Sequence, residues 1–242
     1  MPDLIFADPR LAAIYDQIDD DRRDLDHYEA IVAELGACSV LDIGCGTGVL
    51  GCRLATRGIA VTGMDPAQAS LDVARTKTGA EGITWLLGNA TALPPLTVDV
   101  VTMTGNVAQV FLRDEDWSAT LIGVRAALRD GGYLVFETRD PSYRGWKEWT
   151  RERSIAISDT VAGTVEHWVE LTEVALPLVS FRHSFRFIEA GEVVTSDSTL
   201  RFRDREEIAA TLGVHGFTIE AVRDAPDRPG REFVVIARAT TS

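Results

Sequence analysis

VLDIGCGTG, residues 40–48, is the stretch of sequence that decides the fold of this chain. It has the pattern of a short apolar strand that breaks into glycines and then enters a helix. Because glycine has no Cβ, such a turn lets a nucleotide cofactor lie directly against the backbone. An acidic residue is then expected at the end of the next strand, where it can bind ribose hydroxyls. Asp65 stands there, after the apolar stretch 59–64.

The spacing of the glycines distinguishes two kinds of cofactor. Dinucleotide folds use G-x-G-x-x-G, with the N-terminus of the helix directed at a pyrophosphate. Here the spacing is Gly44-x-Gly46-x-Gly48, and Asp42 comes just before the turn, where it would repel a diphosphate. Asp42 instead suits a cationic ligand, or an ammonium group bound through a water molecule.

These features resemble the first motif of the class I S-adenosylmethionine (SAM)-dependent methyltransferases. The sequence GMDP at 63–66 resembles the family's ribose-binding strand end, 99–103 its fourth strand, and 129–137 its fifth strand after a glycine-rich stop. The resemblance covers residues 40–137 well and the ends more loosely. It implies SAM as the cofactor, S-adenosylhomocysteine as the product, and in-line transfer of the sulfonium methyl group to an acceptor. Such a displacement needs alignment and exclusion of water more than a general base.

The resemblance also implies which residues contact SAM, most of them at the ends of the first four strands. The candidates are Tyr15, Asp42, Gly44, Cys45, Gly46, Met64, Asp65, Asn89, Ala90, Thr104 and Asn106. Asn89 departs from the family's Gly-Asp-Ala pattern, but an amide can still accept from an adenine amino group and donate to a ring nitrogen.

Each less certain candidate has a structural alternative. Asn89 could be a plain turn residue, Asn106 could cap a loop, and Tyr15 could be a core tyrosine rather than a side chain that closes over the cofactor. Cys45 is expected to be a small residue that fills the turn, not a nucleophile.

Composition limits the cell compartment and the substrate. The 242 residues are 45% apolar, enough for one sizeable domain, and no apolar run reaches the ~20 residues that span a membrane. The N-terminus lacks the pattern of a secretory signal. The three cysteines form no CxxC pair, which favours a reducing cytoplasm without disulfides.

The net charge of −13 and the lack of a basic tract argue against nucleic acid and for a small-molecule or protein substrate. We expect a monomer or a homodimer.

Alternation of strands and helices predicts an α/β, Rossmann-like sheet of seven strands with helices on both faces. The expected parallel strands are 39–43, 60–64, 83–87, 98–103 and 132–137, followed by an antiparallel pair at 217–222 and 233–237. Helices are expected after Asp8, before Gly36 and from near Asp114. A last helix should open at the capping box Asp204-x-x-Glu207 and stop at Gly213.

Residues 138–203 differ from the rest. Three segments alternate apolar and polar residues, at 165–171, 178–187 and 193–202, which is typical of half-buried antiparallel strands. The segment follows the fifth strand, so it begins at the edge of the sheet where ligands bind in α/β folds. We therefore expect a methyltransferase core at 1–137 and 204–242, with an antiparallel β lid at 138–203. Small-molecule N-methyltransferases carry similar lids.

Aromatic and basic residues just after the fifth strand are candidates for the substrate pocket. Arg139, Tyr143 and Trp146 could line it, and Trp149 less so, although these aromatics could equally form the core of the lid. His167 and His183 lie on apolar strand faces, where a histidine is more often a hydrogen-bonded core residue. If one of them is catalytic, His183 is favoured, because its face carries more aromatics. The four histidines have no HxH or HxxxH spacing, so no metal site is expected.

The sequence therefore predicts a SAM-dependent methyltransferase that acts on an N or O atom of a small molecule. A protein or RNA substrate is a weaker variant. Two alternatives remain open: a catalytically silent SAM-binding module, and an NAD(P)-dependent oxidoreductase, which would need a G-x-G-x-x-G motif and a base near the nicotinamide.

Overall fold

Seven strands form the larger of two sheets in the computed structural model, which describes residues 2–240. Their order is β10-β11-β5-β4-β1-β2-β3, and the first five strands of the chain run parallel. The final two strands pair antiparallel with each other, and β11 also pairs antiparallel with β5. The strands are β1 (Ser39–Ile43), β2 (Ala60–Asp65), β3 (Thr84–Leu87), β4 (Val98–Met103), β5 (Leu128–Arg139), β10 (Phe217–Asp224) and β11 (Glu232–Ala239). This confirms the predicted sheet, including its antiparallel edge.

Helices cover both faces of this sheet because successive strand residues point to opposite sides. Val40 of β1 packs in one core cluster with residues of α3 and α4, whereas Leu41 packs in the other with residues of α6 and α8. The pairs Val100/Val101 and Leu134/Val135 divide in the same way. The helices are α3 (Asp24–Glu34), α4 (Val49–Thr56), α5 (Gln68–Arg75), α6 (Asp114–Ala127) and α8 (Arg205–Val214).

The last helix begins as predicted but ends later. The Asp204 side chain accepts a hydrogen bond of 2.8 Å from the backbone N–H of Glu207, as a capping residue does. The expected stop at Gly213 is wrong, because the helix continues to Val214. The left-handed residue that ends such a helix is Gly216, with φ of +79°.

A second sheet of four antiparallel strands follows β5, in the order β6-β7-β8-β9. The strands are β6 (Ala156–Thr160), β7 (Gly163–Ala175), β8 (Leu178–Phe187) and β9 (Glu192–Arg201), preceded by the short helices η3 (Gly145–Glu148) and α7 (Arg151–Ser154). Three of the strands match the three alternating segments. The edge strand β6 was not predicted, because it is short and none of its residues is buried.

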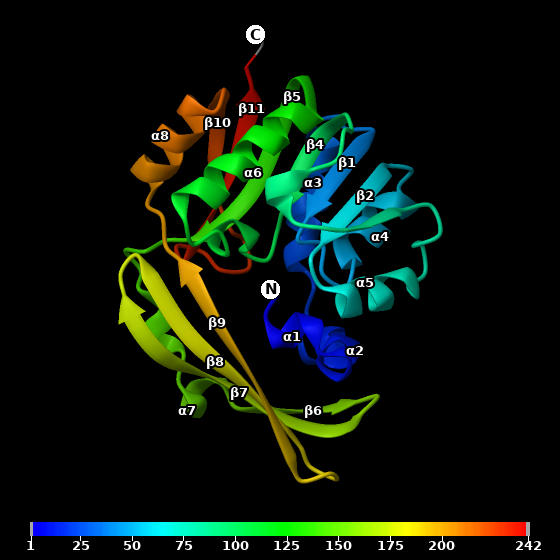
Figure 1. Cartoon of the computed structure of the whole chain (residues 1–242), viewed down its shortest axis with the longest axis vertical. Helices are drawn as coiled ribbons and strands as arrows, with labels where there is room; N and C mark the ends of the chain where they lie inside the picture. Colours follow the sequence, from blue (N-terminus) through cyan, green and yellow to red (C-terminus); the bar gives the residue numbers. More distant parts are fainter. Residues whose placement is uncertain (1, 241–242) are drawn as a thin grey trace.

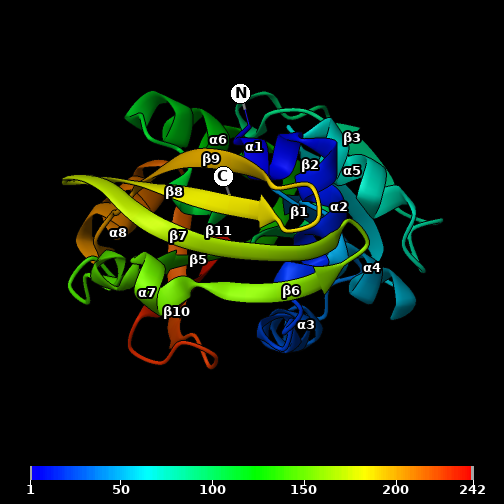
Figure 2. The ribbon, with the colours of Figure 1, turned by 90° about the horizontal axis from the view of Figure 1, so that it is seen from below.

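The second sheet covers the end of the molecule at which the parallel strands of the first sheet finish (Figures 1 and 2). Two N-terminal helices, α1 (Leu4–Ala7) and α2 (Pro9–Ile18), lie between the sheets. Ile14 packs with Val165 and Phe185 of the second sheet, and the Ser70 hydroxyl of α5 donates to the Phe6 carbonyl at 3.0 Å. The N-terminal helices therefore join the two sheets beside the glycine turn. No helix within residues 2–240 has the length and apolarity needed to cross a membrane.

Candidate active site

The glycine turn after β1 is held against the end of β2 by backbone hydrogen bonds. The N–H groups of Gly44 and Cys45 both donate to the Met64 carbonyl, at 2.8 and 3.1 Å. Gly46 donates its N–H to Asp65 Oδ2 at 2.8 Å. The turn and the acidic residue, 19 positions apart in sequence, thus form one unit at the carboxyl edge of the sheet.

The three glycines of the turn all have positive φ, but their surroundings differ. A Cβ on Gly44 would lie 2.4 Å from a methyl group of Val107, and one on Gly48 would lie 2.4 Å from the Trp85 ring. A Cβ on Gly46 would meet nothing within 4 Å. Gly44 and Gly48 are therefore required by packing, whereas Gly46 exposes its backbone to open space, as a residue that cradles a ligand must.

The carboxylate of Asp65 has a fixed position and can accept further hydrogen bonds. It is 7% exposed, and its two carboxylate oxygens accept from the N–H groups of Gly46 and Ala67, both at 2.8 Å. Burial raises the pKa of Asp65, and these two hydrogen bonds oppose the rise. A carboxylate has about four lone-pair sites, so both oxygens can still accept from a pair of hydroxyls.

Asp42 is the other carboxylate beside the turn. It is 1% exposed and accepts a hydrogen bond of 2.7 Å from the Thr102 hydroxyl. Burial raises the pKa of Asp42 to about 7, and the nearby Asp65 adds to the rise. A bound cation would favour the charged form of this carboxyl group and lower its pKa.

Residues after β3 contribute a turn to the same edge. Asn89 is exposed, and its Oδ1 accepts from the Thr91 N–H at 3.1 Å at the start of the short helix η1 (Ala90–Ala92). The turn role considered for Asn89 is therefore present, and its NH2 group stays free to donate to a ligand. The Ala90 side chain is buried in the core.

The loop after β4 contains a strained, buried asparagine. Asn106 has φ of +63° and is 2% exposed, while Thr104 is half-buried. The backbone N–H of Asn106 donates to Glu137 Oε1 at 3.0 Å, and its side-chain Nδ2 donates to Glu232 Oε2 at 3.2 Å. Its Oδ1 is buried without a hydrogen-bond partner in the described part of the chain. A buried, unpaired carbonyl is costly unless a ligand satisfies it.

Sequence reasoning missed the carboxylates that hold Asn106. Glu137 also accepts from the Tyr28 hydroxyl, and burial raises the pKa of Glu137. Glu137 interrupts the apolar strand β5, and an acidic residue in such a strand is a signal that could have been used. Glu232 had no comparable signal, because it is brought to Asn106 by the pairing of β11 with β5.

Helix α2 is attached directly to the glycine turn by residues that the sequence did not single out. Asp16 accepts from the Thr47 hydroxyl at 2.6 Å and forms an ion pair with Lys77 at 2.5 Å, and Lys77 donates to the Thr47 carbonyl at 2.7 Å. The neighbouring Tyr15 packs against Phe6, with ring centroids 5.6 Å apart. Burial raises the pKa of Tyr15 to about 12, so its hydroxyl is neutral.

Cys45 lies within the turn and is half-buried. Burial raises the pKa of its thiol, and the charges of Asp42 and Asp65 raise it further. A thiol of this kind is a poor nucleophile, because the thiolate is the reactive form. Its position is consistent with the expected role as a small residue that fills the turn.

A pocket of about 250 Å³ lies beside Asn106, at the end of β5. Its lining is formed by Arg139, Tyr143, Gly145, Glu148, Trp149, Arg228, Arg231 and Glu232. It includes two of the three residues expected to contact the substrate, Arg139 and Tyr143. The loop between β10 and β11, which supplies the remaining arginines, was not anticipated from sequence.

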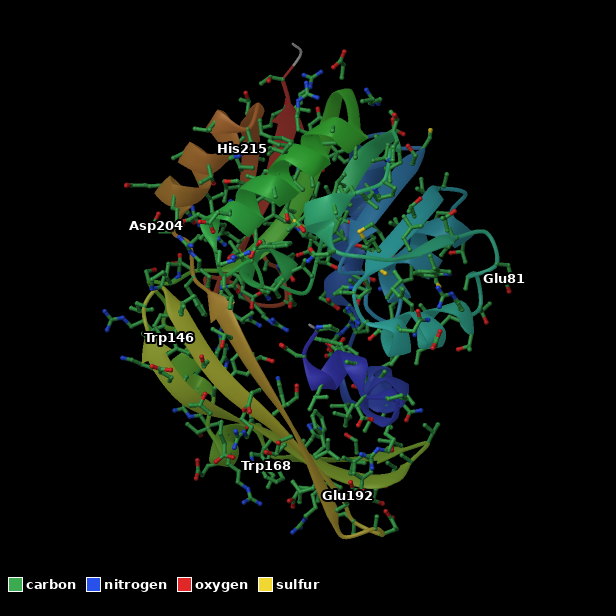
Figure 3. The ribbon with its side chains drawn as sticks, viewed as in Figure 1. Glu81, Trp146, Trp168, Glu192, Asp204 and His215 are labelled. Atoms are coloured by element: carbon green, nitrogen blue, oxygen red, sulfur yellow. The ribbon has the colours of Figure 1, made fainter. Side chains whose placement is uncertain are left out.

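Trp146, the third expected substrate residue, does not line this pocket. It is 4% exposed, and its ring lies edge-on to Phe202 at 4.7 Å within the apolar core of the insert (Figure 3). Trp146 is therefore part of the apolar core of the insert, which was the alternative to a place in the substrate pocket. Trp149 lines the pocket instead, with the Arg139 guanidinium 5.6 Å from its ring centre.

His183 lies on the apolar face of β8, half-buried between Phe181 and Phe185. Burial lowers the pKa of His183 to about 4, and the charges of His167 and Arg139 lower it further. No described residue forms a hydrogen bond with its ring. His167, by contrast, is 3.2 Å from the Ser158 hydroxyl. Of the two histidines, His183 therefore has the neutral ring nitrogen that is available to a ligand.

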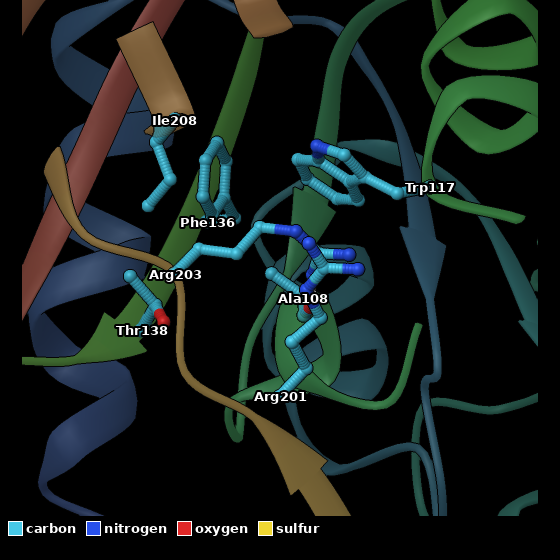
Figure 4. A pocket seen from close by; sticks show the side chains of 7 residues that line it. All are labelled: Ala108, Trp117, Phe136, Thr138, Arg201, Arg203 and Ile208. Carbon is cyan, nitrogen blue, oxygen red and sulfur yellow. Dashed lines mark hydrogen bonds between the residues drawn. The ribbon is translucent and has the colours of Figure 1, made fainter. Parts of the chain in front are cut away.

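A second, much smaller cavity of about 10 Å³ lies between β5 and α6. Figure 4 shows Arg203 extended across it towards Trp117, with its guanidinium 5.1 Å from the ring centre. Arg203 also donates to the carbonyls of Ala108 and Phe111. The cavity could hold about one water molecule. The hydrogen bonds of Arg203 connect the end of the insert to the core. Residues 2–240 contain no cluster of His, Cys, Asp and Glu that could hold a metal ion.

The chain is similar to known methyltransferases. Residues 40–132 match the family model described as a methyltransferase domain. Cypemycin N-terminal methyltransferase from Streptomyces sp. is 34% identical over 105 residues, which cover 43% of each chain. The chain thus spans about half or less of the length of the curated relatives it matches.

Two solved structures share the fold over nearly the whole chain. An S-adenosylmethionine-dependent methyltransferase from Clostridium acetobutylicum has a TM-score of 0.78 at 19% identity, over 96% of this chain and 98% of that chain. CalS10 from Micromonospora echinaspora, an amino pentose methyltransferase with bound SAM, has a TM-score of 0.69 at 22% identity, over 91% and 93% of the two chains.

Proposed function

Because this chain carries a methyltransferase-family domain at residues 40–132 and has the class I SAM-dependent methyltransferase fold, we propose that it transfers a methyl group from SAM to a small molecule. The acceptor is an N or O atom, and the second product is S-adenosylhomocysteine. The curated relatives include an N-terminal methyltransferase and an O-methyltransferase of ubiquinone biosynthesis, so both atoms belong to the proposal. SAM supplies a methyl group already activated by the positive sulfonium.

The observation that carries this proposal is the unit formed by Gly46 and Asp65. Gly46 exposes its backbone to open space, and Asp65 keeps two oxygens able to accept hydroxyl hydrogen bonds beside it. A nucleoside fits such a site, with its ribose on Asp65. The buried Oδ1 of Asn106, which has no partner among the described residues, adds a further acceptor in the loop after β4.

The remaining expected residues complete the proposed binding site for SAM. Asp42 offers a negative charge for the ammonium group of the methionine part. Met64 and the NH2 group of Asn89 face the adenine end, together with the backbone of Ala90. Tyr15 closes the site from α2, where Asp16 fastens this helix to the turn. Thr104 and Asn106 border the methyl group.

The insert supplies the acceptor side of the proposed reaction. We assign residues 138–203 to a lid and residues 1–137 and 204–242 to the core, with α1 and α2 packed on the lid. The lid covers the edge of the first sheet where transfer would take place (Figure 1), and shielding from water there would favour transfer between aligned atoms. His183 is the candidate to accept a hydrogen bond or a proton from an acceptor N–H or O–H group. Its ring is neutral, and its pKa of about 4 makes it a weaker base than an ordinary histidine.

Two other functions fit less well. An oxidoreductase would bind a pyrophosphate at the turn, where the buried Asp42 would repel it. A silent SAM-binding module has no need for a pocket beside the methyl position, whereas a pocket of about 250 Å³ lies next to Asn106. We propose a small-molecule partner, no nucleic acid or membrane partner, and a monomer or homodimer in a reducing, cytoplasmic environment.

Calorimetric titration with SAM, and with NAD as the control, tests the proposal. Micromolar SAM binding without NAD binding is the expected result. Transfer of radiolabelled methyl from SAM to a panel of small amines, sugars and phenols then separates an enzyme from a silent module. Absence of SAM binding would refute the proposed cofactor, and SAM binding without transfer to any class of acceptor would favour the silent module.

A further inference from the structure

The pocket beside Asn106 is lined by more arginines than carboxylates, although the chain as a whole is acidic. Three guanidinium groups line it, those of Arg139, Arg228 and Arg231, against two carboxylates, those of Glu148 and Glu232. The whole chain has a net charge of −13. A third carboxylate, that of Asp227, pairs with Arg228 from outside the lining, so the donor groups of the pocket, rather than a net charge, indicate what it binds.

Arg139 is the arginine of this pocket with a donor edge left free. Its Nε lies 3.3 Å from Glu232 Oε1, and its Nη1 donates to Gln109 Oε1 at 3.2 Å. No described residue accepts a hydrogen bond from its Nη2. Its side chain is 24% exposed, so the guanidinium is partly withdrawn from water and fixed along two edges. One edge of a fixed, planar donor group is thus left for a ligand.

Glu232 is a carboxylate partner that two arginines share. Its Oε1 is shared between Arg139 and Arg228, which donates to it at 2.8 Å, and its Oε2 accepts from Asn106. Arg231 has its own partner, Glu148, at 3.1 Å, and lies nearer the rim, with its side chain 48% exposed. Arg228 has a second carboxylate partner, Asp227, at 3.3 Å, and its side chain is 47% exposed. Of the three arginines, Arg139 is therefore the one most withdrawn from water, and it lies next to the loop that follows β4.

We propose that this pocket is an anion subsite, in which the free Nη2 edge of Arg139 binds a carboxylate or phosphate group of the methyl acceptor. This assignment rests on the proposed methyl transfer and narrows it to small acceptors that carry an anionic oxygen group as well as the methylated atom. Arg139 donates from Nη2 to one oxygen of that group. A planar guanidinium fits either anion. The aromatic ring of Trp149 forms the apolar wall.

The test measures binding of matched probes in the presence of S-adenosylhomocysteine. Benzoate, phenyl phosphate and the neutral isostere benzamide are titrated calorimetrically into the wild-type protein, Arg139→Gln, Arg139→Lys and the control Arg182→Gln. Arg182 pairs with Asp197 on the exposed, outward side of the insert. Comparison of benzoate with phenyl phosphate identifies which anion the subsite takes.

We expect one of the two anions to bind the wild-type protein at least about tenfold more tightly than benzamide. Arg139→Gln should weaken that binding about 10- to 100-fold, because a charge-assisted hydrogen bond is lost. Arg139→Lys should be intermediate, because it keeps the charge and loses the planar fork. Arg182→Gln should not change it. Thermal unfolding of Arg139→Gln checks that the variant is folded.

Equal binding of benzamide and both anions would overturn the subsite, as would absence of binding by either anion or full anion affinity in folded Arg139→Gln. The SAM titration distinguishes these failures from failure of the proposed function. If the anion binds and SAM does not, the subsite stands and methyl transfer falls. If SAM binds and the anions behave like benzamide, methyl transfer stands with an uncharged acceptor.

Discussion

Gly46 and Asp65 are joined by a hydrogen bond of 2.8 Å from the glycine N–H to Oδ2 of the carboxylate. The bond links the turn after β1 to the end of β2, so the open backbone of the turn and the acceptor oxygens beside it keep a fixed separation. Because the second oxygen of Asp65 binds the Ala67 N–H, the carboxylate cannot rotate freely. A ligand with two neighbouring hydroxyls therefore meets a prearranged site.

Replacement of this carboxylate tests its proposed contact with ribose. Asp65→Ala should weaken SAM binding by roughly 2–4 kcal/mol, because two hydrogen bonds to a charged acceptor are lost. Calorimetric titration measures the change. Asp72→Ala, on the exposed surface of α5, is the control and should bind SAM normally. Wild-type affinity in Asp65→Ala would remove Asp65 from the site.

Gly46 and Gly36 form a matched pair for testing the open backbone. Both have positive φ, +53° and +63°, and a Cβ on either would meet nothing within 4 Å. Alanine at either position should therefore cost a similar ~1–2 kcal/mol of folding free energy. Only Gly46→Ala should also reduce SAM affinity, by at least about tenfold, because its Cβ would project into the proposed cofactor site.

Thermal unfolding and SAM titration of both alanine variants give the two readouts. Equal loss of SAM affinity in Gly36→Ala and Gly46→Ala would mean that the effect comes from strain. Unchanged affinity in both would show that the cofactor does not lie against Gly46.

The sequence predicted the parts of this site that depend on local pattern. Strand ends, the glycine turn and Asp65 follow from residues close together in the chain, and the alternating face of β8 predicted the burial of Phe181 and Phe185. Arg139 and Tyr143 were expected at the pocket because they directly follow a strand end.

Contacts between distant segments could not be predicted in the same way. Asp16 lies on the amphipathic helix α2, and nothing in its local sequence indicates that it meets Thr47 and Lys77. Glu232 reaches Asn106, 126 positions away, only through the pairing of β11 with β5. Trp146 was misplaced because aromatic residues after a strand end suit a pocket and a lid core equally well.

Asp42 gives the SAM affinity a dependence on pH. Burial raises its pKa in the folded protein to about 7, above the ordinary value of 3.8. The folded protein therefore binds this proton more tightly than the unfolded chain, so the contribution of Asp42 to stability falls as pH rises from about 4 to 7. The ammonium group of SAM favours the ionised form, so the affinity for SAM should rise between pH 6 and 8.

Asp42→Asn, which cannot ionise, should bind SAM more weakly at pH 8 and show a smaller rise between pH 6 and 8 than the wild type. Calorimetric titrations at four pH values measure both effects, with Asp72→Asn as the control. The same pH dependence in Asp42→Asn and the wild type would show that Asp42 does not bind the ammonium group.

His183 is the last residue whose role a simple substitution can decide. Its pKa, lowered to about 4 by burial, leaves the ring neutral at pH 7, and no described residue occupies its ring nitrogens. If the ring accepts a proton from the acceptor, His183→Gln should lower kcat at least about 100-fold and leave SAM affinity unchanged. Because His183 is already neutral, the wild-type rate should show no decline from its protonation between pH 7 and 5.5.

His167→Gln, on the same face but bonded to Ser158, is the control and should keep kcat within about threefold. Wild-type kcat in His183→Gln would instead make His183 a packing residue between Phe181 and Phe185, and methyl transfer would then depend on alignment alone.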